Sequence, residues 1–451
     1  INDAIIKQAE KLAFAHTSFF TNEPAEELAK LLSTNSPTGL DKVYFVSSGS
    51  EAIEASLKLA KQYFNEIGKP KKHKVISRKQ SYHGNTLGAL AVGGNIQRRS
   101  LFEDLLIETS LISPCYKYRF QDANESEIQY GLRVANELED EIIRLGPDNV
   151  MAFIAETVVG ATAGALTPVK GYFERIREIC TNYDVLLILD EVMCGMGRTG
   201  PLFACDEEKI VPDIITIAKG LGAGYQPIAA MMCQNFINDA INRGSGFFQH
   251  GHTYLGHPIA CAASLAVVNK LIKENFFEKV RKKGEYLQKS LEVTLGQNEY
   301  IGDIRGRGLF RAVELVQNRE TKEPFAKYDN NRYDLKKIFK MLIENKPFQL
   351  ILIAISTTWV ANNMKTATVI YFVKYNLNLE QFFGPIVLGA ILQIILGAWI
   401  TNLIKNKLEK KDITSIIIEA GDSEYSEDSQ KLYDGEIIGD NLADLSYSRL
   451  R

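Results

Sequence analysis

The chain has 451 residues, of which 45% are hydrophobic, and a formal net charge of −3 at pH 7. This length predicts two or more domains, and the nearly balanced charge gives no basis for expecting nucleic-acid binding. The six cysteines are scattered and form no CxxC pair, a usage typical of reduced thiols in a cytosolic protein.

Short apolar runs alternate with amphipathic helical patterns along most of the chain. The pattern predicts helices at 50–64, 125–145, 171–183, 257–273 and 276–295. It predicts strands at 43–48, 74–78, 151–156, 186–190, 214–218 and 229–233. Such alternation is typical of an α/β fold in three layers, in which helices cover both faces of a mainly parallel sheet.

The first predicted strand leads through a Ser-Gly-Ser turn into a helix, in VYFVSSGSEAIEASLKLAKQYF (43–64). The start of a helix presents unpaired N–H groups and the positive end of the helix dipole, and both favour a phosphate. Gly49 would let the backbone approach such a group closely, and Ser50 would add a hydroxyl. A Ser-Gly pair before a helix is also an ordinary N-cap, so this motif alone does not distinguish the two.

The next motif, SYHGNTLGALAVGG (81–94), contains an aromatic residue, Tyr82, beside a glycine-rich turn. Its ring could lie flat against the ring of an aromatic cofactor. Taken alone, a tyrosine at such a position more often belongs to a core or an interface.

Two later strands are predicted to end at one edge of the sheet with a carboxylate and an amine. Asp190 ends the apolar run of VLLILDEVMCGMGRTG (185–200), and Lys219 follows the run of DIITIAKGLGAGYQP (213–227). Ligands of α/β sheets bind at that edge. The pair suits pyridoxal phosphate (PLP), because Lys219 would form a Schiff base and Asp190 would keep the pyridine nitrogen protonated. Taken singly, a surface lysine and a helix-capping aspartate explain these residues better.

A histidine-rich segment follows in FFQHGHTYLGHPIACAASLAV (247–267). The spacing of His250, His252 and His257 matches no zinc motif, and no cysteine lies at a suitable offset. The sequence therefore predicts no metal site.

Taken in order, these motifs resemble those of the class III (ω-type) aminotransferases, which are fold-type-I PLP enzymes, from residue 1 to about residue 330. The resemblance implies that Lys219 carries the cofactor and that Asp190 pairs with the pyridine nitrogen. It also implies that Val192 and Tyr82 lie against opposite faces of the cofactor ring.

The same resemblance assigns the remaining cofactor-binding residues. Gly49 and Ser50 would form the phosphate cup, and Glu156 would lie beneath the cofactor. The residue after that glutamate is commonly proline, whereas this chain has Thr157. Thr253 would reach the phosphate in the neighbouring subunit, which implies an obligate homodimer with shared sites.

The implied activity is transfer of an amino group to a keto acid by ping-pong chemistry, with freed Lys219 as the general base. Relatives that use glutamate and 2-oxoglutarate carry a second glutamate five residues after the first, where this chain has Ala161. Met193 stands where many relatives have glutamine. A small residue at position 161 resembles the branch that uses amines or ω-amino acids with pyruvate. Another PLP reaction on this fold, a decarboxylase or an aminomutase, is the alternative.

The sequence predicts a PLP-binding large domain at 1–299, without the family's N-terminal segment. Residues 300–334 are predicted to begin a truncated small domain, opened by a strand in YIGDIRGRGLFRAVELV. Arg305 and Arg307 in this stretch are candidate carboxylate binders. A structural role is favoured, because the family's substrate arginine lies much nearer its C-terminus.

The hydrophobic pattern changes after residue 334. Residues 382–404 are 23 residues without a charge, and 348–373 are apolar with polar interruptions. Residues 340–411 are therefore predicted to form a two-helix transmembrane fragment, in which flanking lysines place both ends in the cytoplasm. They resemble part of a glycoside–pentoside–hexuronide:cation symporter, so membrane association through 348–404 is expected. The alternative is a core helix pair of a globular domain.

The last segment, 412–451, has ten acidic and three basic residues and is predicted to be disordered. The simplest account of the whole chain is an aminotransferase lacking both ends and joined to a transporter fragment. Two hypotheses follow: a cytoplasmic PLP aminotransferase, or an inactive chimera tethered to the membrane.

Overall fold

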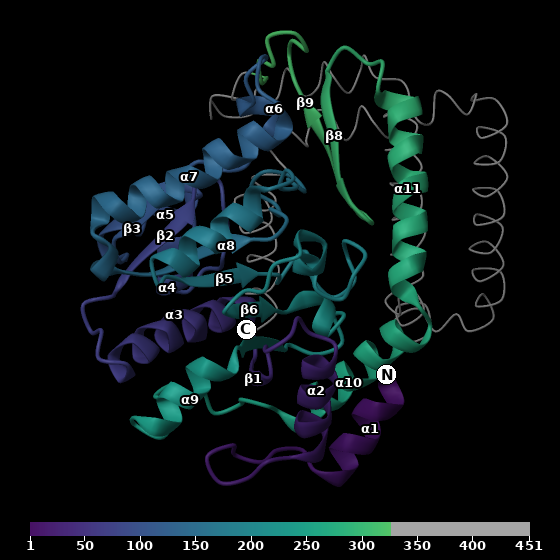
Figure 1. The fold of residues 1–451 in the computed structure, drawn as a ribbon. Coiled ribbons are helices and arrows are strands. Elements are labelled where there is room, and N and C mark those ends of the chain that lie inside the picture. The colour runs from purple at the N-terminus through teal and green to yellow at the C-terminus, as the bar shows by residue number, and fades with distance from the viewer. Residues whose placement is uncertain (326–451) are drawn as a thin grey trace, which may run out of the picture. The chain divides into compact units, whose positions relative to one another are not determined.

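A seven-stranded sheet organises residues 1–325, the part of the chain that the computed structural model describes (Figure 1). The strand order is β1-β7-β6-β5-β4-β2-β3. Strand β7 is antiparallel to both of its neighbours, and every other neighbouring pair is parallel. All strands except β7 therefore end at the same edge, the carboxyl edge of the sheet. The strands are β1 (Lys42–Val46), β2 (Lys74–Arg78), β3 (Thr109–Ile112), β4 (Val150–Glu156), β5 (Leu186–Asp190), β6 (Ile214–Ile217) and β7 (Ala229–Cys233).

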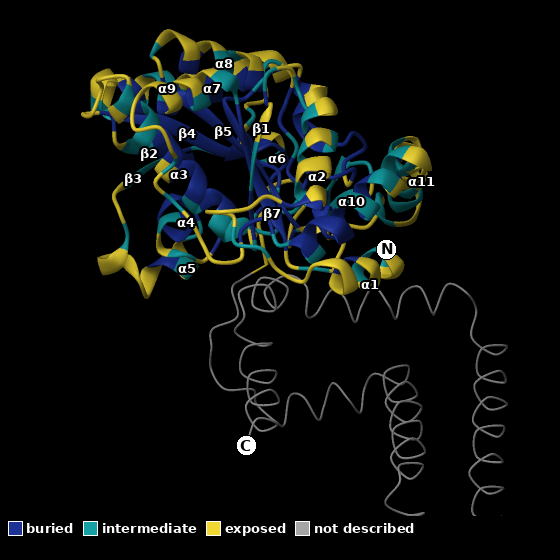
Figure 2. Cartoon of the chain, turned by 90° about the horizontal axis from the view of Figure 1, so that it is seen from below, coloured by how far each residue is buried: buried dark blue, intermediate teal, exposed yellow. Residues whose placement is uncertain are grey.

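Helices cover both faces of this sheet, and each covered face has its own apolar cluster. In Figure 2 the strands lie in the buried interior, while the outer faces of the helices are exposed. One face carries α2 (Glu23–Thr34), α7 (Glu127–Leu145), α8 (Tyr172–Asn182) and α10 (Pro258–Lys273). The other face carries α3 (Gly49–Glu66), α4 (Leu87–Val92) and α9 (Asn235–Arg243).

The ends of the longer helices follow local sequence signals. Helix α7 begins in a capping box, in which Ser126 and Gln129 each accept a hydrogen bond from the other's backbone. Helix α3 begins after Ser48, whose side chain accepts a hydrogen bond from the N–H of Glu51. The central strands β4 and β5 are buried at every position, which explains why they read as continuous apolar runs.

A two-stranded antiparallel sheet, β8-β9, lies beside the long helix α11 (Figure 1). The prediction of one strand after residue 300 was wrong, because the chain turns back at Gly306 and Gly308, whose φ angles are +126° and +52°. The bounds of these and the remaining elements are α1 (Asn2–Lys11), α5 (Ile96–Ser100), α6 (Lys117–Phe120), α11 (Phe276–Leu295), β8 (Ile301–Arg307) and β9 (Phe310–Leu315).

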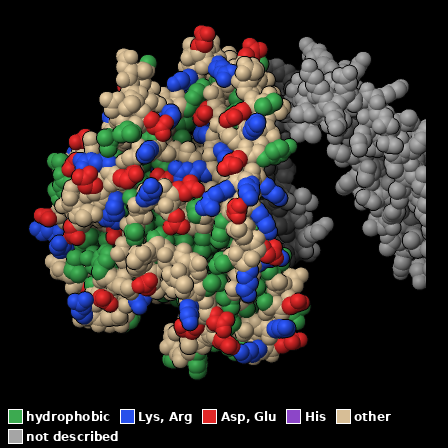
Figure 3. Space-filling view, turned by 45° about the vertical axis from the view of Figure 1, so that its right-hand side comes forward, with side chains coloured by type: hydrophobic (Ala, Val, Ile, Leu, Met, Phe, Trp, Pro, Cys, Tyr) green, Lys and Arg blue, Asp and Glu red, His purple; other side chains and the backbone are tan. Residues whose placement is uncertain are grey.

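The six predicted strands and the five predicted helices are confirmed, with ends that differ by at most two residues. The short strand β3 was not predicted. On the face drawn in Figure 3, basic and acidic side chains are interspersed, as the small net charge leads one to expect.

The predicted fragment 340–411 and the tail 412–451 lie outside the described residues. Within residues 1–325, no helix combines the length and the apolar character that a membrane span requires.

Candidate active site

Three polar residues stand side by side where the central strands reach the carboxyl edge. Glu156 pairs in register with Asp190, and Asp190 pairs with Thr216. Side chains alternate along a strand, and Ile154 and Ile188, two residues earlier, belong to the apolar cluster under α3. Glu156, Asp190 and Thr216 therefore face the layer that contains α3.

Asp190 is held in one orientation by two donors. Its Oδ2 lies 2.8 Å from Nδ1 of His83, and its Oδ1 accepts a hydrogen bond of 2.9 Å from the N–H of Val192. The His83 side chain is fully buried, and that of Asp190 is 5% exposed. A buried carboxyl group bound in this way cannot turn toward water, so its orientation at the sheet edge is fixed.

Lys219 starts the short helix η4 (Lys219–Leu221) just beyond β6. Its φ of +39° is unusual for a residue with a side chain, and such strain is concentrated at functional sites. Lys219 remains exposed, yet the surrounding protein displaces enough water to lower the pKa of its amine, while Asp190 opposes this shift. Lys219 is therefore accessible to solvent and at the same time partly desolvated.

Glu156 connects the strand end to two loops. Its Oε2 accepts from the N–H of Tyr82 at 3.3 Å, and its Oε1 accepts from the N–H of Gly160 at 3.0 Å. Burial raises the pKa of this carboxyl, and the nearby charge of His83 partly offsets that effect. The ring of Tyr82 is half-buried, and the guanidinium of Arg98 lies 4.6 Å from its centroid.

The first turn of α3 combines three features that suit an anion. The hydroxyl of Ser50 accepts a hydrogen bond of 3.1 Å from the N–H of Asn85, so its own hydrogen remains available to a ligand. A Cβ at Gly49 would lie 2.9 Å from Val192, so only glycine permits this close packing. The bare backbone, the hydroxyl and the helix dipole suit a phosphate.

Thr253 is exposed on the loop before α10. Leu255, two residues later, belongs to the same buried apolar cluster as Val46 and Ala218, so this loop is anchored next to the strand ends. The single chain thus brings seven of the eight predicted site residues to the carboxyl edge and leaves Thr253 at the surface.

Two site residues were missed by the sequence analysis. His83 lies 107 positions before the aspartate that it contacts, so no local pattern reveals the pair. Thr216 is fully buried, and its hydroxyl has no hydrogen-bond partner within residues 1–325. An unpaired hydroxyl in this row indicates that a further polar group belongs at the site.

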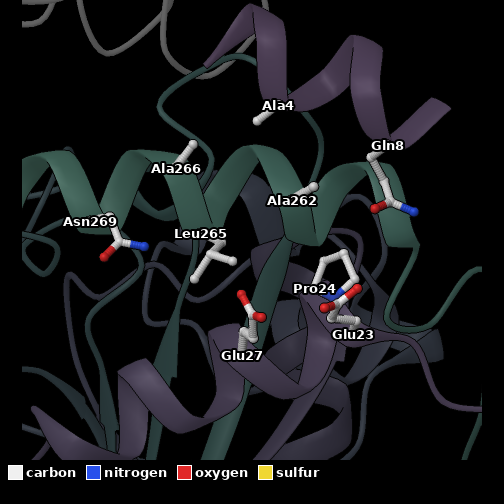
Figure 4. Close-up of a pocket in the computed structure, with 9 residues that line it drawn as sticks. All are labelled: Ala4, Gln8, Glu23, Pro24, Glu27, Ala262, Leu265, Ala266 and Asn269. Atoms are coloured by element: carbon white, nitrogen blue, oxygen red, sulfur yellow. The ribbon is translucent and has the colours of Figure 1, made fainter. Parts of the chain in front are cut away.

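The residues at this edge fit PLP by their chemistry. They include an amine, a carboxylate held in one orientation, an aromatic ring and a helix start that suits a phosphate. A separate cavity of about 350 Å³ lies between α1, α2 and α10, and its wall includes Glu23, Glu27 and Asn269 (Figure 4). None of the predicted site residues lines it.

Comparisons with known proteins give a consistent picture. The family described as "Aminotransferase class-III" matches residues 1–343. A protein named "Aminotransferase" from Gibberella zeae is 44% identical over 333 residues, which are 73% of this chain and 65% of that protein. An "Uncharacterized aminotransferase" of Schizosaccharomyces pombe is 45% identical over 324 residues, which are 72% of this chain and 71% of that protein.

Among solved structures, the omega transaminase of Pseudomonas jessenii in complex with PMP is similar to this chain, with 37% identity and a TM-score of 0.69. The match covers 72% of each chain.

Proposed function

The chain belongs to the class-III aminotransferases, a family that uses PLP, and from this membership we propose that it moves an amino group from an amine or ω-amino acid to a keto acid. The observation that carries the proposal is that an amine, Lys219, and a carboxylate held in one orientation, Asp190, stand at the same sheet edge, near enough for Asp190 to oppose the desolvation that lowers the pKa of the amine. PLP supplies an aldehyde that condenses with amines and a protonated ring that withdraws electrons.

Each residue at the edge has a defined task in this proposal. Lys219 would bind the aldehyde covalently, and Asp190 would hold the proton on the pyridine nitrogen, with His83 fixing that carboxylate. Tyr82 and Val192 would enclose the ring. Gly49 and Ser50 would hold the phosphate, and Glu156 would support the loops beneath the ring.

Lys219 would also move the proton that the reaction requires. An amine accepts a proton only when it is neutral, and desolvation lowers the pKa of Lys219. A larger share of this amine is therefore neutral near pH 7 than for an ordinary surface lysine. The same residue can then hold the cofactor at rest and act as a base during turnover.

Pyruvate is the acceptor that we propose. In relatives that use 2-oxoglutarate, a glutamate at the position of Ala161 pairs with a pocket arginine while a monocarboxylate is bound and releases the arginine for a dicarboxylate. Ala161 has no carboxylate and cannot make this exchange, which favours pyruvate. Gly160 lies against Met193, since a Cβ at position 160 would be 2.6 Å from the Met193 sulfur. A thioether and small residues provide a wall with little polarity, which suits an uncharged donor side chain.

A homodimer is part of the proposal, with Thr253 of one subunit reaching the phosphate in the other. The exposed loop that carries Thr253 supports it, and so do exposed aromatic residues on either side, Phe247 at 63% and Tyr254 at 59%. Aromatic residues are common at the centre of protein interfaces, so their exposure here is compatible with a partner surface.

The proposal can be tested by adding PLP to the purified chain and recording the visible absorption of the bound cofactor. An amine donor should convert the spectrum to that of the aminated cofactor, and a keto acid should restore it. Restoration should be faster with pyruvate than with 2-oxoglutarate. Faster restoration by 2-oxoglutarate would remove the pyruvate assignment and leave amino transfer intact, whereas no spectral change with any donor would contradict the transaminase proposal.

A further inference from the structure

The loop that follows Glu156, residues 157–166, forms one side of the proposed site and is here called the wall loop. It folds back on itself through two hydrogen bonds between Val159 and Leu166, of 2.9 and 3.1 Å. Gly160 in this loop donates to the Glu156 carboxylate and packs against Met193. The position of the wall loop therefore sets the position of two groups at the site.

The tip of the wall loop is strained and needs an external support. Gly164 and Ala165 both adopt the left-handed conformation, with φ of +59° and +44°, which is costly for alanine. A Cβ at Gly164 would lie 3.2 Å from the Cβ of Ala312 on β9, so the tip packs directly on the β8-β9 hairpin.

Arg305 on β8 provides the polar part of that support. Its Nε donates to the carbonyl of Gly164 at 2.8 Å, and its Nη2 donates to the carbonyl of Ala163 at 2.7 Å. The Arg305 side chain is only 11% exposed, so these are charge-assisted bonds shielded from water.

The three remaining N–H groups of Arg305 are also used. They contact Asp303 at 3.0 Å, Glu314, and the hydroxyl of Tyr116 at 3.2 Å. Arg119 donates to the other oxygen of Glu314 at 2.7 Å, so two arginines balance two carboxylates. An arginine has five N–H donors, and all five are engaged here. Arg305 therefore cannot bind a substrate carboxylate without giving up one of these protein partners.

We propose that Arg305 is a positioning residue of the active site, which fixes the wall loop so that Gly160 stays on Glu156 and against Met193. This inference rests on the proposed function. Lysine cannot replace Arg305, because its single ammonium cannot reach two carbonyls and two carboxylates in this fork-like arrangement.

The test compares two substitutions in the PLP-loaded full chain. Arg305→Lys removes the fork, and Arg307→Lys is the matched control, because Arg307 lies on the same strand but pairs with Glu207 and Glu208. Hydrogen exchange at Val159, Gly160 and Leu166 should become faster in Arg305→Lys, by roughly tenfold or more for the loss of two charge-assisted bonds. Exchange there should not change in Arg307→Lys.

Kinetics then separate positioning from substrate binding. KM should rise by roughly tenfold in Arg305→Lys with little change in kcat, equally for an ω-amino acid and for an amine without a carboxylate. Gly164→Ala pushes the tip away from β9 and should also give faster exchange and a higher KM. It replaces Arg305→Lys in the test if that variant does not fold. A rise confined to the carboxylate-bearing donor would make Arg305 a substrate binder and overturn the proposal.

Two other outcomes would also overturn it. Unchanged exchange in both the Arg305→Lys and the Gly164→Ala variants would show that the fork does not hold the loop. Faster exchange with unchanged KM would show that the loop does not shape the site. If the unsubstituted chain neither binds PLP nor transfers amino groups, the proposed function is contradicted. Hydrogen exchange distinguishes that failure from a failure of the fork, because the wall loop of the unsubstituted chain should still exchange slowly.

Discussion

Lys72 and Lys219 lie at opposite edges of the same sheet and show two uses of a desolvated amine. Lys72, at the amino edge, is 3% exposed, and its Nζ lies within hydrogen-bond distance, 2.8–3.2 Å, of four backbone carbonyls, which share its three N–H groups. Lys219, at the carboxyl edge, is exposed and has a strained backbone, and its side-chain amine makes no hydrogen bond within residues 1–325. Desolvation lowers the pKa of both amines.

The difference lies in whether the protein itself satisfies the charge. The carbonyls around Lys72 come from Pro147, Val150, Tyr183 and Asp184, so this amine ties together the segments that enter β4 and β5. Lys219 has no such set and stays available to a ligand. A desolvated amine whose N–H groups are all hydrogen-bonded to the protein stabilises the fold, whereas one without such bonds can react with a ligand.

Removal of Lys219 should have the largest effect on activity. We expect Lys219→Ala to lower kcat by about 10³-fold or more, since both the covalent anchor and the base are lost. The melting temperature should change little, because the substitution leaves the backbone hydrogen bonds of residue 219 in place and its side-chain amine makes none within residues 1–325. Steady-state transamination and thermal unfolding of the same preparation test this, and retained turnover would refute the assignment.

Lys72→Met should show the opposite pattern. We expect the free energy of unfolding to fall by about 4 kcal/mol, because several buried carbonyls lose their donor. The folded fraction should keep its kcat. The matched control is Lys69→Met, whose exposed pair with Asp184 should cost less than about 1 kcal/mol. Equal losses in the two variants, measured by denaturant unfolding, would contradict the role given to Lys72.

Glu191 should make stability depend on pH. Its carboxyl accepts hydrogen bonds from Thr157, Ala204 and Cys205, and burial raises its pKa to about 7. The folded state then holds a proton that the unfolded state releases near its ordinary pKa. The proton on Glu191 therefore stabilises the folded state in acid, and this stabilisation is lost as the pH rises through about 7. The change in the free energy of unfolding is about 3 kcal/mol at most.

The Glu191→Gln variant provides the comparison for that pH dependence. Its stability should vary less between weakly acidic and neutral pH than that of the unsubstituted chain, whatever its absolute stability. Parallel unfolding curves at each pH would show that Glu191 does not titrate in this range.

Thr253→Ala should give the smallest effect. If Thr253 completes the phosphate site of the partner subunit, its loss should weaken PLP binding by about tenfold, as expected for one hydrogen bond to a charged group. Affinity measured by cofactor titration, with dimer content checked at the same concentrations, tests this. Unchanged affinity would remove Thr253 from the site.

Much of the fold and part of the site could be predicted from the sequence, for a common reason. Parallel strands buried on both faces read as apolar runs, and each run that ends at the carboxyl edge is followed by a polar turn. Asp190 and Lys219 could therefore be assigned to one edge before their neighbours were known.

The missed features depend on contacts between distant segments. His83 contacts Asp190 from another strand end, and Arg305 supports the wall loop from 141 residues away. The hairpin after residue 300 was missed because its turn depends on the left-handed conformation of Gly308. None of these contacts leaves a periodic signal in the sequence.

The central claim is that Lys219 is the residue that binds the cofactor. The direct measurement is to load the chain with PLP, reduce the covalent linkage with borohydride, digest the protein and locate the modified lysine by mass spectrometry. We expect the label on Lys219 and its absence in the unreduced sample. A label on a different lysine, or no label in a sample that retains bound PLP, would contradict the account.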